Sequence, residues 1–276
     1  MIKKLSLFAC LAFFALSCEE IPPRLNPGGG INPDPTDQQR HVLIEEFTGV
    51  RCVNCPAGSA AIETLRSIYG DQLIAVSIHA GFFAPPYPES TQDFRTTEGT
   101  NILSYLGEPL GYPTAVVNRK LFSGEPDLQT GQGQWPGFVA EEAALPPQVA
   151  IEIEKNYIPA TRGLQVNIKL DALETIAEND LRLSVMITED EVTDTQLTPA
   201  GKTNNYAHRH VLRAMMSAYD GLPLGESLEL GDELSRSFNY ALPLAWNAEK
   251  CHIIAFLHHS SADKSVIQAQ ELKVTD

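Results

Sequence analysis

The chain has 276 residues, which is enough for one large domain or two ordinary ones. Its 35 acidic residues outnumber its 20 basic residues, so the formal net charge is −15. Such an acidic balance argues against nucleic-acid binding and against docking on anionic lipid through basic patches.

The first 17 residues have the layout of a secretory signal peptide. Two lysines precede an apolar stretch from Leu5 to Leu16, which is too short to span a membrane. Ala-Leu-Ser then leads into Cys18 and is similar to the cleavage box of bacterial lipoproteins. We therefore expect residues 1–17 to be removed and Cys18 to carry the lipid; an ordinary signal peptide cleaved elsewhere is the alternative. Both place the protein outside the cytosol, where disulfides persist.

Residues 18–40 form a predicted tether between the lipid and the folded body. The segment is rich in Pro and Gly, with three glycines in a row at 28–30, and it has few apolar residues. Such a composition cannot build a hydrophobic core. Flexible-coil scaling gives a span of roughly 25 Å, so the tether would hold the body off the membrane.

Residues 41–145 alternate between strand-like and helix-like patterns. Apolar runs bounded by turn signals predict buried strands, and apolar residues at near-helical spacing predict helices. In chain order we predict a strand at Val42–Phe47, a helix at Ala57–Tyr69, a strand at Leu73–Ile78, a helix at Ile102–Leu106, strands at Ala115–Asn118 and Lys120–Phe122, and a helix at Trp135–Leu145. This order, β-α-β followed by β-β-α, is that of an α/β thioredoxin-like domain.

Cys52 and Cys55 form a Cys-x-x-Cys pair between the first predicted strand and the first predicted helix. A helix N-terminus favours a thiolate over a thiol, so we expect Cys52, beside Arg51, to be an exposed nucleophile with a lowered pKa. Cys55, one turn along, would resolve the mixed disulfide that Cys52 forms. Two alternatives remain open. The pair could be half of a zinc site, although the sequence has no second Cys pair, or it could be a purely structural disulfide.

Residues 41–145 resemble the thioredoxin superfamily, and the resemblance implies roles for three residues of this segment. Cys52 falls at the position of the family's exposed nucleophile, and Cys55 at the position of its buried partner. Glu46 falls where thioredoxins have a buried acid that moves protons for the second Cys. Arg51 stands where a Trp is usual, and the two residues between the cysteines match no common dipeptide of the family. The direction of the redox reaction therefore stays open.

The same resemblance implies a substrate-binding edge at Tyr112-Pro113-Thr114. Pro113 falls on the family's cis-proline and Thr114 follows it, while the backbone of Tyr112 would pair with the substrate chain. From the residues alone, Pro113 could instead be a trans turn proline, since cis is the minority state of X-Pro bonds. Glu46 could likewise be a solvated strand acid.

Two further features lie between the second predicted strand and Pro113. The aromatic and proline-rich insert Phe82–Pro88 could form a hydrophobic lip for an unfolded or partner chain, but we favour an insert that packs on its own domain. His79, at the end of the strand, could be a pocket residue or a polar residue at a strand end. We favour the second.

Residues 146–276 begin at Pro146-Pro147, after which the apolar period changes to two. Alternating apolar residues predict strands around 149–153, 164–170, 181–187, 238–242, 252–257 and 266–267, which is typical of an all-β immunoglobulin-like sandwich. Cys251 opens a core-like strand and is expected to be a buried, unreactive thiol. His208 and His210 are expected to share one face of a strand, as a polar patch at a domain junction; two histidines are too few for a metal site.

The chain as a whole resembles the outer-membrane protein twenty-eight family of Gram-negative lipoproteins. The resemblance rests on the box at Cys18, on Glu-Glu-Phe-Thr-Gly at 45–49 before the Cys pair, and on His-Arg-His-Val-Leu-Arg at 208–213. It implies an outer-membrane lipoprotein on the periplasmic face or the cell surface.

We therefore expect thiol–disulfide exchange on exported proteins, with no cofactor and no metal. The expected partners are thiols and disulfides of exported proteins, the membrane through the lipid anchor, and an envelope protein, but no nucleic acid. The alternative is a non-enzymatic surface binding or adhesin-like protein whose Cys pair is structural.

Overall fold

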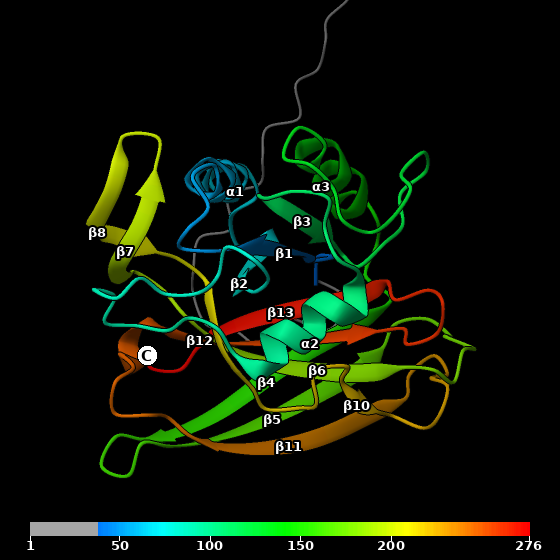
Figure 1. The fold of residues 1–276 in the computed structure, drawn as a ribbon. Helices are drawn as coiled ribbons and strands as arrows, with labels where there is room; N and C mark the ends of the chain where they lie inside the picture. Colours follow the sequence, from blue (N-terminus) through cyan, green and yellow to red (C-terminus); the bar gives the residue numbers. More distant parts are fainter. Residues whose placement is uncertain (1–37) are drawn as a thin grey trace, which may run out of the picture. The chain divides into compact units, whose positions relative to one another are not determined.

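The computed structural model describes residues 38–276, which lie within one unit, Pro33–Asp276 (Figure 1). The predicted signal peptide, the lipidation site at Cys18 and nearly all of the predicted tether lie outside the described residues. Within residues 38–276, no helix combines the length and the apolar character needed to cross a membrane.

A mixed sheet of eight strands, here called the main sheet, runs through this unit. Its order is β13-β12-β6-β9-β2-β1-β3, and β10 pairs with β6. The strands are β1 (Val42–Thr48), β2 (Leu73–His79), β3 (Thr114–Val117), β6 (Arg182–Glu189), β9 (Val211–Met215), β10 (Leu222–Pro223), β12 (Cys251–His258) and β13 (Val266–Lys273). β1 runs parallel to β2 and antiparallel to β3, and β2 meets β9 in parallel at Ser77 and Val211. The predicted segments 41–145 and 146–276 thus both contribute strands to one sheet, which the sequence patterns do not indicate.

Three helices cover the β1–β3 part of the main sheet. α1 (Cys55–Tyr69) and α3 (Trp135–Ala143) pack against one face, and α2 (Thr97–Leu106) packs against the other. Side chains alternate along β1, so that Ile44 faces α1 and α3 while Leu43 faces α2. Every residue of β1 and β2 is buried, as expected for strands that are covered on both faces.

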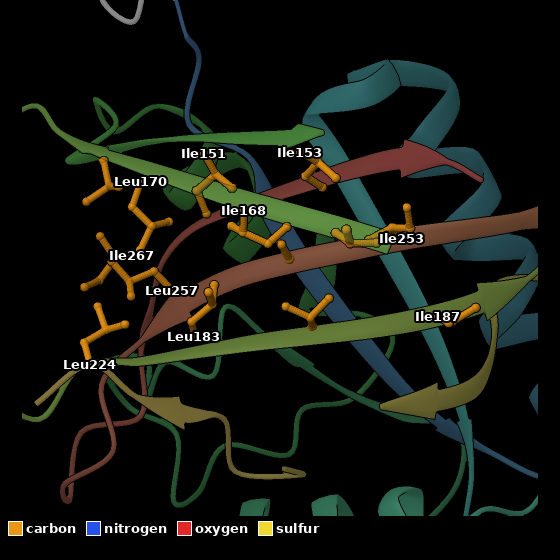
Figure 2. Close-up of a cluster of buried hydrophobic side chains, with 14 of the residues drawn as sticks. Ile151, Ile153, Ile168, Leu170, Leu183, Ile187, Leu224, Ile253, Leu257 and Ile267 are labelled. Carbon is orange, nitrogen blue, oxygen red and sulfur yellow. The ribbon is translucent and has the colours of Figure 1, made fainter. Parts of the chain in front are cut away.

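A second, antiparallel sheet has the order β11-β5-β4 and is here called the small sheet. Its strands are β4 (Val149–Ile158), β5 (Gly163–Ala172) and β11 (Glu233–Ala241). Side chains such as Ile168 pack against Leu183 and Ile253 of the main sheet, and Figure 2 shows this shared core. The second half of the chain is therefore rich in β-strands, as predicted, while the immunoglobulin-like arrangement of strands stays a prediction.

The chain turns sharply after β3. Asn118 and Arg119 both have positive φ, 45° and 49°, and the chain then leaves the sheet. The predicted strand Lys120–Phe122 is therefore wrong, and the edge of β3 is bridged instead by Thr130. The turn sends Arg119 into the core, where its guanidinium donates two hydrogen bonds of 2.7 Å to the carboxylate of Glu45.

Candidate functional site

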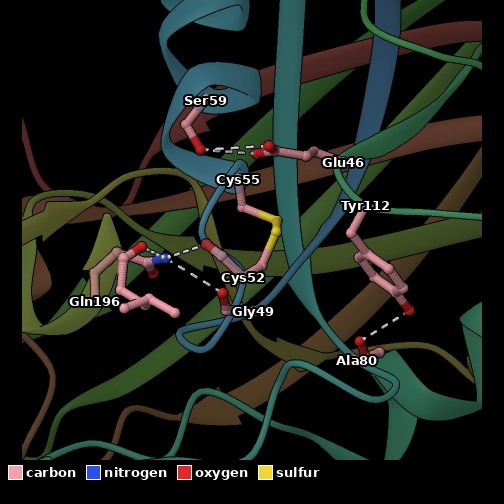
Figure 3. Close-up of a disulfide and its surroundings, with 9 residues drawn as sticks. Glu46, Gly49, Cys52, Cys55, Ser59, Ala80, Tyr112 and Gln196 are labelled. Carbon is pink, nitrogen blue, oxygen red and sulfur yellow. Dashed lines mark hydrogen bonds between the residues drawn. A yellow bond between two sulfur atoms is a disulfide. The ribbon is translucent and has the colours of Figure 1, made fainter. Parts of the chain in front are cut away.

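Cys52 and Cys55 are joined by a disulfide at the turn between β1 and α1 (Figure 3). Their Cα atoms lie 5.4 Å apart. The amide of Cys52 donates to the carbonyl of Gly49 at 3.0 Å, and α1 begins at Cys55 with Pro56 in its first turn. The pair thus lies at the predicted strand-to-helix turn. A zinc site would need both sulfurs as free thiolates, so the zinc alternative does not fit this oxidised state.

Glycine at position 58 brings the first turns of α1 close to two other predicted site residues. A Cβ on Gly58 would lie 2.6 Å from the Cβ of Pro113 and 2.8 Å from Oε1 of Glu46. Atoms cannot approach so closely, so only glycine permits this packing. Pro113 and Glu46 therefore both lie against the helix that begins at Cys55.

Glu46 is completely buried on the α1 side of β1. The hydroxyls of Ser59 and Ser77 donate to its carboxyl group, each at 3.2 Å to Oε2. Burial raises the pKa of Glu46 to about 8, and the two hydrogen bonds oppose this rise only in part. Glu46 is therefore protonated at neutral pH. The alternative of a solvated strand acid is wrong, while its role in proton transfer stays a prediction.

The segment Tyr112–Thr114 lies beside the same helix. The Tyr112–Pro113 peptide bond is cis, as the resemblance implies. The Tyr112 hydroxyl donates to the carbonyl of Ala80 at 3.2 Å. The side chain of Thr114 is buried and donates to the carbonyl of Thr130 at 3.0 Å, so it is engaged within the protein. The predicted substrate-binding roles of Tyr112 and Thr114 stay predictions.

A hairpin from the second half of the chain covers the Cys pair. It consists of β7 (Val192–Thr198) and β8 (Gly201–His208), which form a two-stranded sheet of their own. Nε2 of Gln196 donates to the carbonyl of Cys52 at 2.9 Å and to that of Gly49 at 3.4 Å (Figure 3). Sequence patterns missed this hairpin, because its residues are mostly polar.

The covered Cys pair has almost no contact with solvent. Cys52 is 3% exposed and Cys55 is 1% exposed. A backbone hydrogen bond of 2.8 Å from Leu197 to Val50 adds to the contacts of Gln196. The expectation that Cys52 is exposed is therefore wrong for the oxidised protein, because the hairpin lies over it.

The insert Phe82–Pro88 contacts Arg51, the residue before Cys52. The guanidinium of Arg51 donates to the carbonyls of Pro85 and Pro86 at 2.7 and 2.6 Å and lies over the ring of Tyr87. The insert thus packs on its own domain, as favoured from the sequence, although the ring of Phe82 is 84% exposed. Arg51 serves to hold this insert against the loop that carries Cys52.

A small polar cavity of about 10 Å³ lies next to Cys55. This volume is about that of a single water position. Among the residues that line it are Cys55, Ser59, Ser77, His79, Tyr206 and His208. The cavity therefore combines groups from α1, from β2 and from the hairpin.

His79 and His208 meet at this cavity. Their ring centroids lie 5.4 Å apart, and each ring also contacts Phe94. Burial lowers the pKa of His79 and lowers that of His208 to about 4, so both are neutral at neutral pH. His79 is thus a buried pocket residue, and the favoured interpretation as a strand-end polar residue is wrong.

His210 lies apart from His208. His208 ends β8, whereas His210 follows it with a positive φ of 52°, and its Nε2 lies 2.8 Å from Oε1 of Glu63. The prediction that the two histidines share one face of a strand is wrong, because the strand ends between them.

Cys251 is the remaining cysteine within residues 38–276 and opens β12 as a free, fully buried thiol. Burial raises its pKa to about 12, and the nearby carboxylate of Glu189 adds to the rise. Because the thiolate is the reactive form, this agrees with the predicted unreactive thiol.

Residues 107–276 match the family model described as outer membrane protein Omp28. The chain belongs to the Omp28 family. The match includes Tyr112–Thr114 and the β7–β8 hairpin, whereas Cys52 and Cys55 precede it. Membership of this family agrees with the outer-membrane location that the sequence predicts. No curated protein is significantly similar to the chain.

Several solved structures are similar to the chain. HBP35 of Porphyromonas gingivalis aligns over 86% of this chain and 76% of its own, with a TM-score of 0.64 and 17% identity. A structural-genomics structure from Agrobacterium tumefaciens aligns over 87% of this chain and 97% of its own, with a TM-score of 0.54 and 16% identity. At such identities the similarity concerns the fold alone. A domain of the outer membrane lipoprotein Omp28 from Porphyromonas gingivalis aligns over 46% of this chain and 88% of its own, with 19% identity and a TM-score of 0.30.

Proposed function

We propose that the protein is an outer-membrane lipoprotein, anchored through Cys18, whose thioredoxin-like site exchanges disulfides with exported proteins. The observation that carries this proposal is the joint placement of three features around the start of α1. The Cys52–Cys55 disulfide, the buried and protonated Glu46, and Pro113 all lie against the first turns of one helix. A disulfide that only stabilises the fold requires neither a buried acid nor an adjacent proline.

The exchange begins with a partner thiolate that attacks Sγ of Cys52. The Cys52–Cys55 bond breaks, a mixed disulfide forms on Cys52, and Cys55 leaves as a thiolate that takes a proton from Glu46. A second partner thiolate then attacks the partner sulfur, and Cys52 leaves. The partner's two thiols have become a disulfide, and the protein's disulfide has become two thiols. In the opposite direction the ionised Glu46 accepts the proton of Cys55.

Access to Cys52 requires a movement, because the side chain is buried under the hairpin. Gln196 is the side chain that ties the hairpin to the loop carrying Cys52. We propose that the β7–β8 hairpin swings away from this loop when a partner binds.

Gln196→Ala should therefore speed the reduction of the Cys52–Cys55 disulfide by a small dithiol. Its hydrogen bonds to two carbonyls together contribute about 1–3 kcal/mol, so we expect a roughly tenfold faster reaction. Thiol release measured over time gives the rate, and Gln165→Ala, an exposed position on β5, is the matched control. Equal rates in wild type and Gln196→Ala would show that the hairpin does not limit access.

Cys55→Ser should trap mixed disulfides with exported proteins. Its free Cys52 thiolate can still attack a partner disulfide, whereas Cys55, which would resolve the mixed disulfide in this direction, is gone. Non-reducing gels of cell envelopes would show adducts that disappear on reduction. The double variant Cys52→Ser/Cys55→Ser should show none, and Cys251→Ser should behave as wild type. A Cys55→Ser protein without adducts, under conditions where a known oxidoreductase traps its clients, would contradict the exchange proposal.

The lipid anchor is tested separately. Cys18→Ser should abolish labelling of the protein with radioactive or clickable acyl chains, because the residue that carries the lipid is gone.

The second candidate is a non-enzymatic surface binding protein with a structural disulfide. The observation in its favour is the burial of Cys52, together with the exposed apolar side chains of Phe82 and Leu110. The reduction potential separates the two candidates. Exchange enzymes lie between about −120 and −270 mV, whereas structural disulfides lie below about −300 mV.

A further inference from the structure

Two buried histidines line the cavity beside Cys55, and the exchange steps described above do not use them. His79 ends β2 and His208 ends β8, and they are 3% and 4% exposed. Nδ1 of His79 and Nε2 of His208 have no hydrogen-bonding partner among residues 38–276. A buried polar atom without a partner loses the hydrogen bonds that water would give it, so its presence calls for an explanation.

The cavity connects these histidines with the surroundings of Glu46. Ser59 and Ser77, whose hydroxyls donate to the Glu46 carboxyl group, also line the cavity. Cys55 lines it as well. The leaving thiol, the two hydroxyls on the buried acid and the two imidazoles therefore surround one polar space.

Glu46 needs such a connection because it is 0% exposed, on a strand that is paired on both sides, with β2 and with β3. In each exchange Glu46 either loses a proton and must regain one, or gains a proton and must lose it. Bulk water does not reach its carboxyl group. A neutral imidazole has one donor and one acceptor nitrogen, so it can take a proton on one side and release it on the other. Hydroxyl groups can act in the same way.

We propose that His79 and His208, together with Ser59 and Ser77, form a proton outlet that links Glu46 to solvent. The inference rests on the proposed exchange function and deepens it by naming the groups that restore the protonation of Glu46. The ring of His208 lies next to that of Tyr206, with the ring centroids 4.9 Å apart, and Arg209 follows His208 in the chain. Tyr206 and Arg209 are partly exposed, so the outlet reaches the surface along the hairpin. The other ionisable groups near the two imidazoles are Asp93, Asp194 and Arg213.

The proton balance is simple. When Cys55 leaves as a thiolate, Glu46 gives it a proton and becomes a carboxylate. A proton from solvent then passes through His208 and His79, and a serine hydroxyl delivers it to Glu46. Each imidazole releases one proton as it accepts one, so neither is changed and no co-reactant other than water is required.

The test measures the proton exchange of Glu46 directly, without a disulfide partner. The pH is changed rapidly across the pKa of Glu46, which is about 8, and the infrared band of the protonated carboxyl group then reports how fast Glu46 gains or loses its proton. The band that is missing in Glu46→Gln belongs to Glu46. His79→Phe/His208→Phe should slow this rate by roughly a hundredfold, a typical contribution of a positioned proton-transfer group. His252→Phe, a histidine paired with Glu271 outside this cavity, is the matched control and should leave the rate unchanged.

Chemical rescue separates proton transfer from a structural role. His208→Ala leaves room for a small molecule, so added imidazole should restore the rate, whereas 1,3-dimethylimidazolium, which cannot relay a proton, should not. Equal rates in wild type and the double Phe variant, or equal rescue by both compounds, would overturn the inference. If the double variant does not fold, His79→Gln and His208→Gln, which keep polar side chains, take its place with the same expectation.

The outcome is independent of the exchange proposal. Trapped adducts without imidazole rescue would support the exchange proposal and contradict the proton outlet. Imidazole rescue without trapped adducts would support the proton outlet and contradict the exchange proposal.

Discussion

Arg119→Met should lower the free energy of unfolding by about 3–5 kcal/mol, the usual cost of leaving a buried charge without its partner. The side chains of Arg119 and Glu45 are both 0% exposed and form a bidentate pair at 2.7 Å. The guanidinium also lies 4.7 Å from the ring centre of Phe256. Removal of Arg119 would leave the Glu45 carboxylate with no compensating charge in the core. Urea unfolding followed by circular dichroism measures the effect.

Two controls make this result specific. The double variant Arg119→Met/Glu45→Leu should recover most of the loss, because it leaves no buried charge. Arg95→Met breaks an exposed pair with Asp93, whose side chains are 45% and 46% exposed, and should cost no more than about 1 kcal/mol. If Arg119→Met and Arg95→Met cost the same, the buried pair does not contribute as described.

Glu46→Gln should become increasingly more stable than wild type as the pH rises from about 4.5 to about 8. The pKa of Glu46 is about 8 in the folded protein and 4.5 as its ordinary value, so in this range the folded state holds a proton that the unfolded state has lost. The stability of the wild type therefore falls with rising pH relative to the variant. At about 1.4 kcal/mol for each pKa unit, the relative change is a few kcal/mol.

The comparison with Glu46→Gln is needed because buried histidines act in the opposite direction. Burial lowers the pKa of His41, His79, His208 and His258, so these groups lower the stability as the pH falls below their ordinary value of 6.5. This effect is common to both proteins and cancels in the difference. Glu178→Gln, at an exposed position, is the matched control for the exchange of a carboxylate for an amide. If the stability difference between Glu46→Gln and wild type is the same at every pH, the pKa of Glu46 is not raised by burial.

The local parts of the site could be predicted from the sequence. β1, α1 and β2 have short apolar runs or near-helical spacing, and the Cys pair lies between them, so local patterns were sufficient. The burial of Glu46 was implied by resemblance to a family, because an acid within an apolar strand does not by itself indicate which way its side chain points.

The position of the β7–β8 hairpin over the Cys pair could not be predicted, because it depends on contacts between residues that are far apart in the sequence. Asp194 and Gln196 are buried polar residues whose partners lie more than a hundred residues earlier in the chain. Apolar and polar residues do not alternate along β7, so the sequence lacks the period of two that indicates a strand. The meeting of His79 with His208 depends on the same long-range contact. The wrong strand at Lys120–Phe122 has a similar cause, since a turn that looks like a hairpin is used to bury Arg119 instead.

The distance along the chain between the Cys pair and its cover has a consequence for how the protein matures. Gln196 lies 144 residues after Cys52. A chain exported from its N-terminus presents both thiols to the oxidants of the cell envelope before the residues that cover them have emerged. The disulfide can therefore form in an open, incomplete chain, and completion of the fold then encloses it.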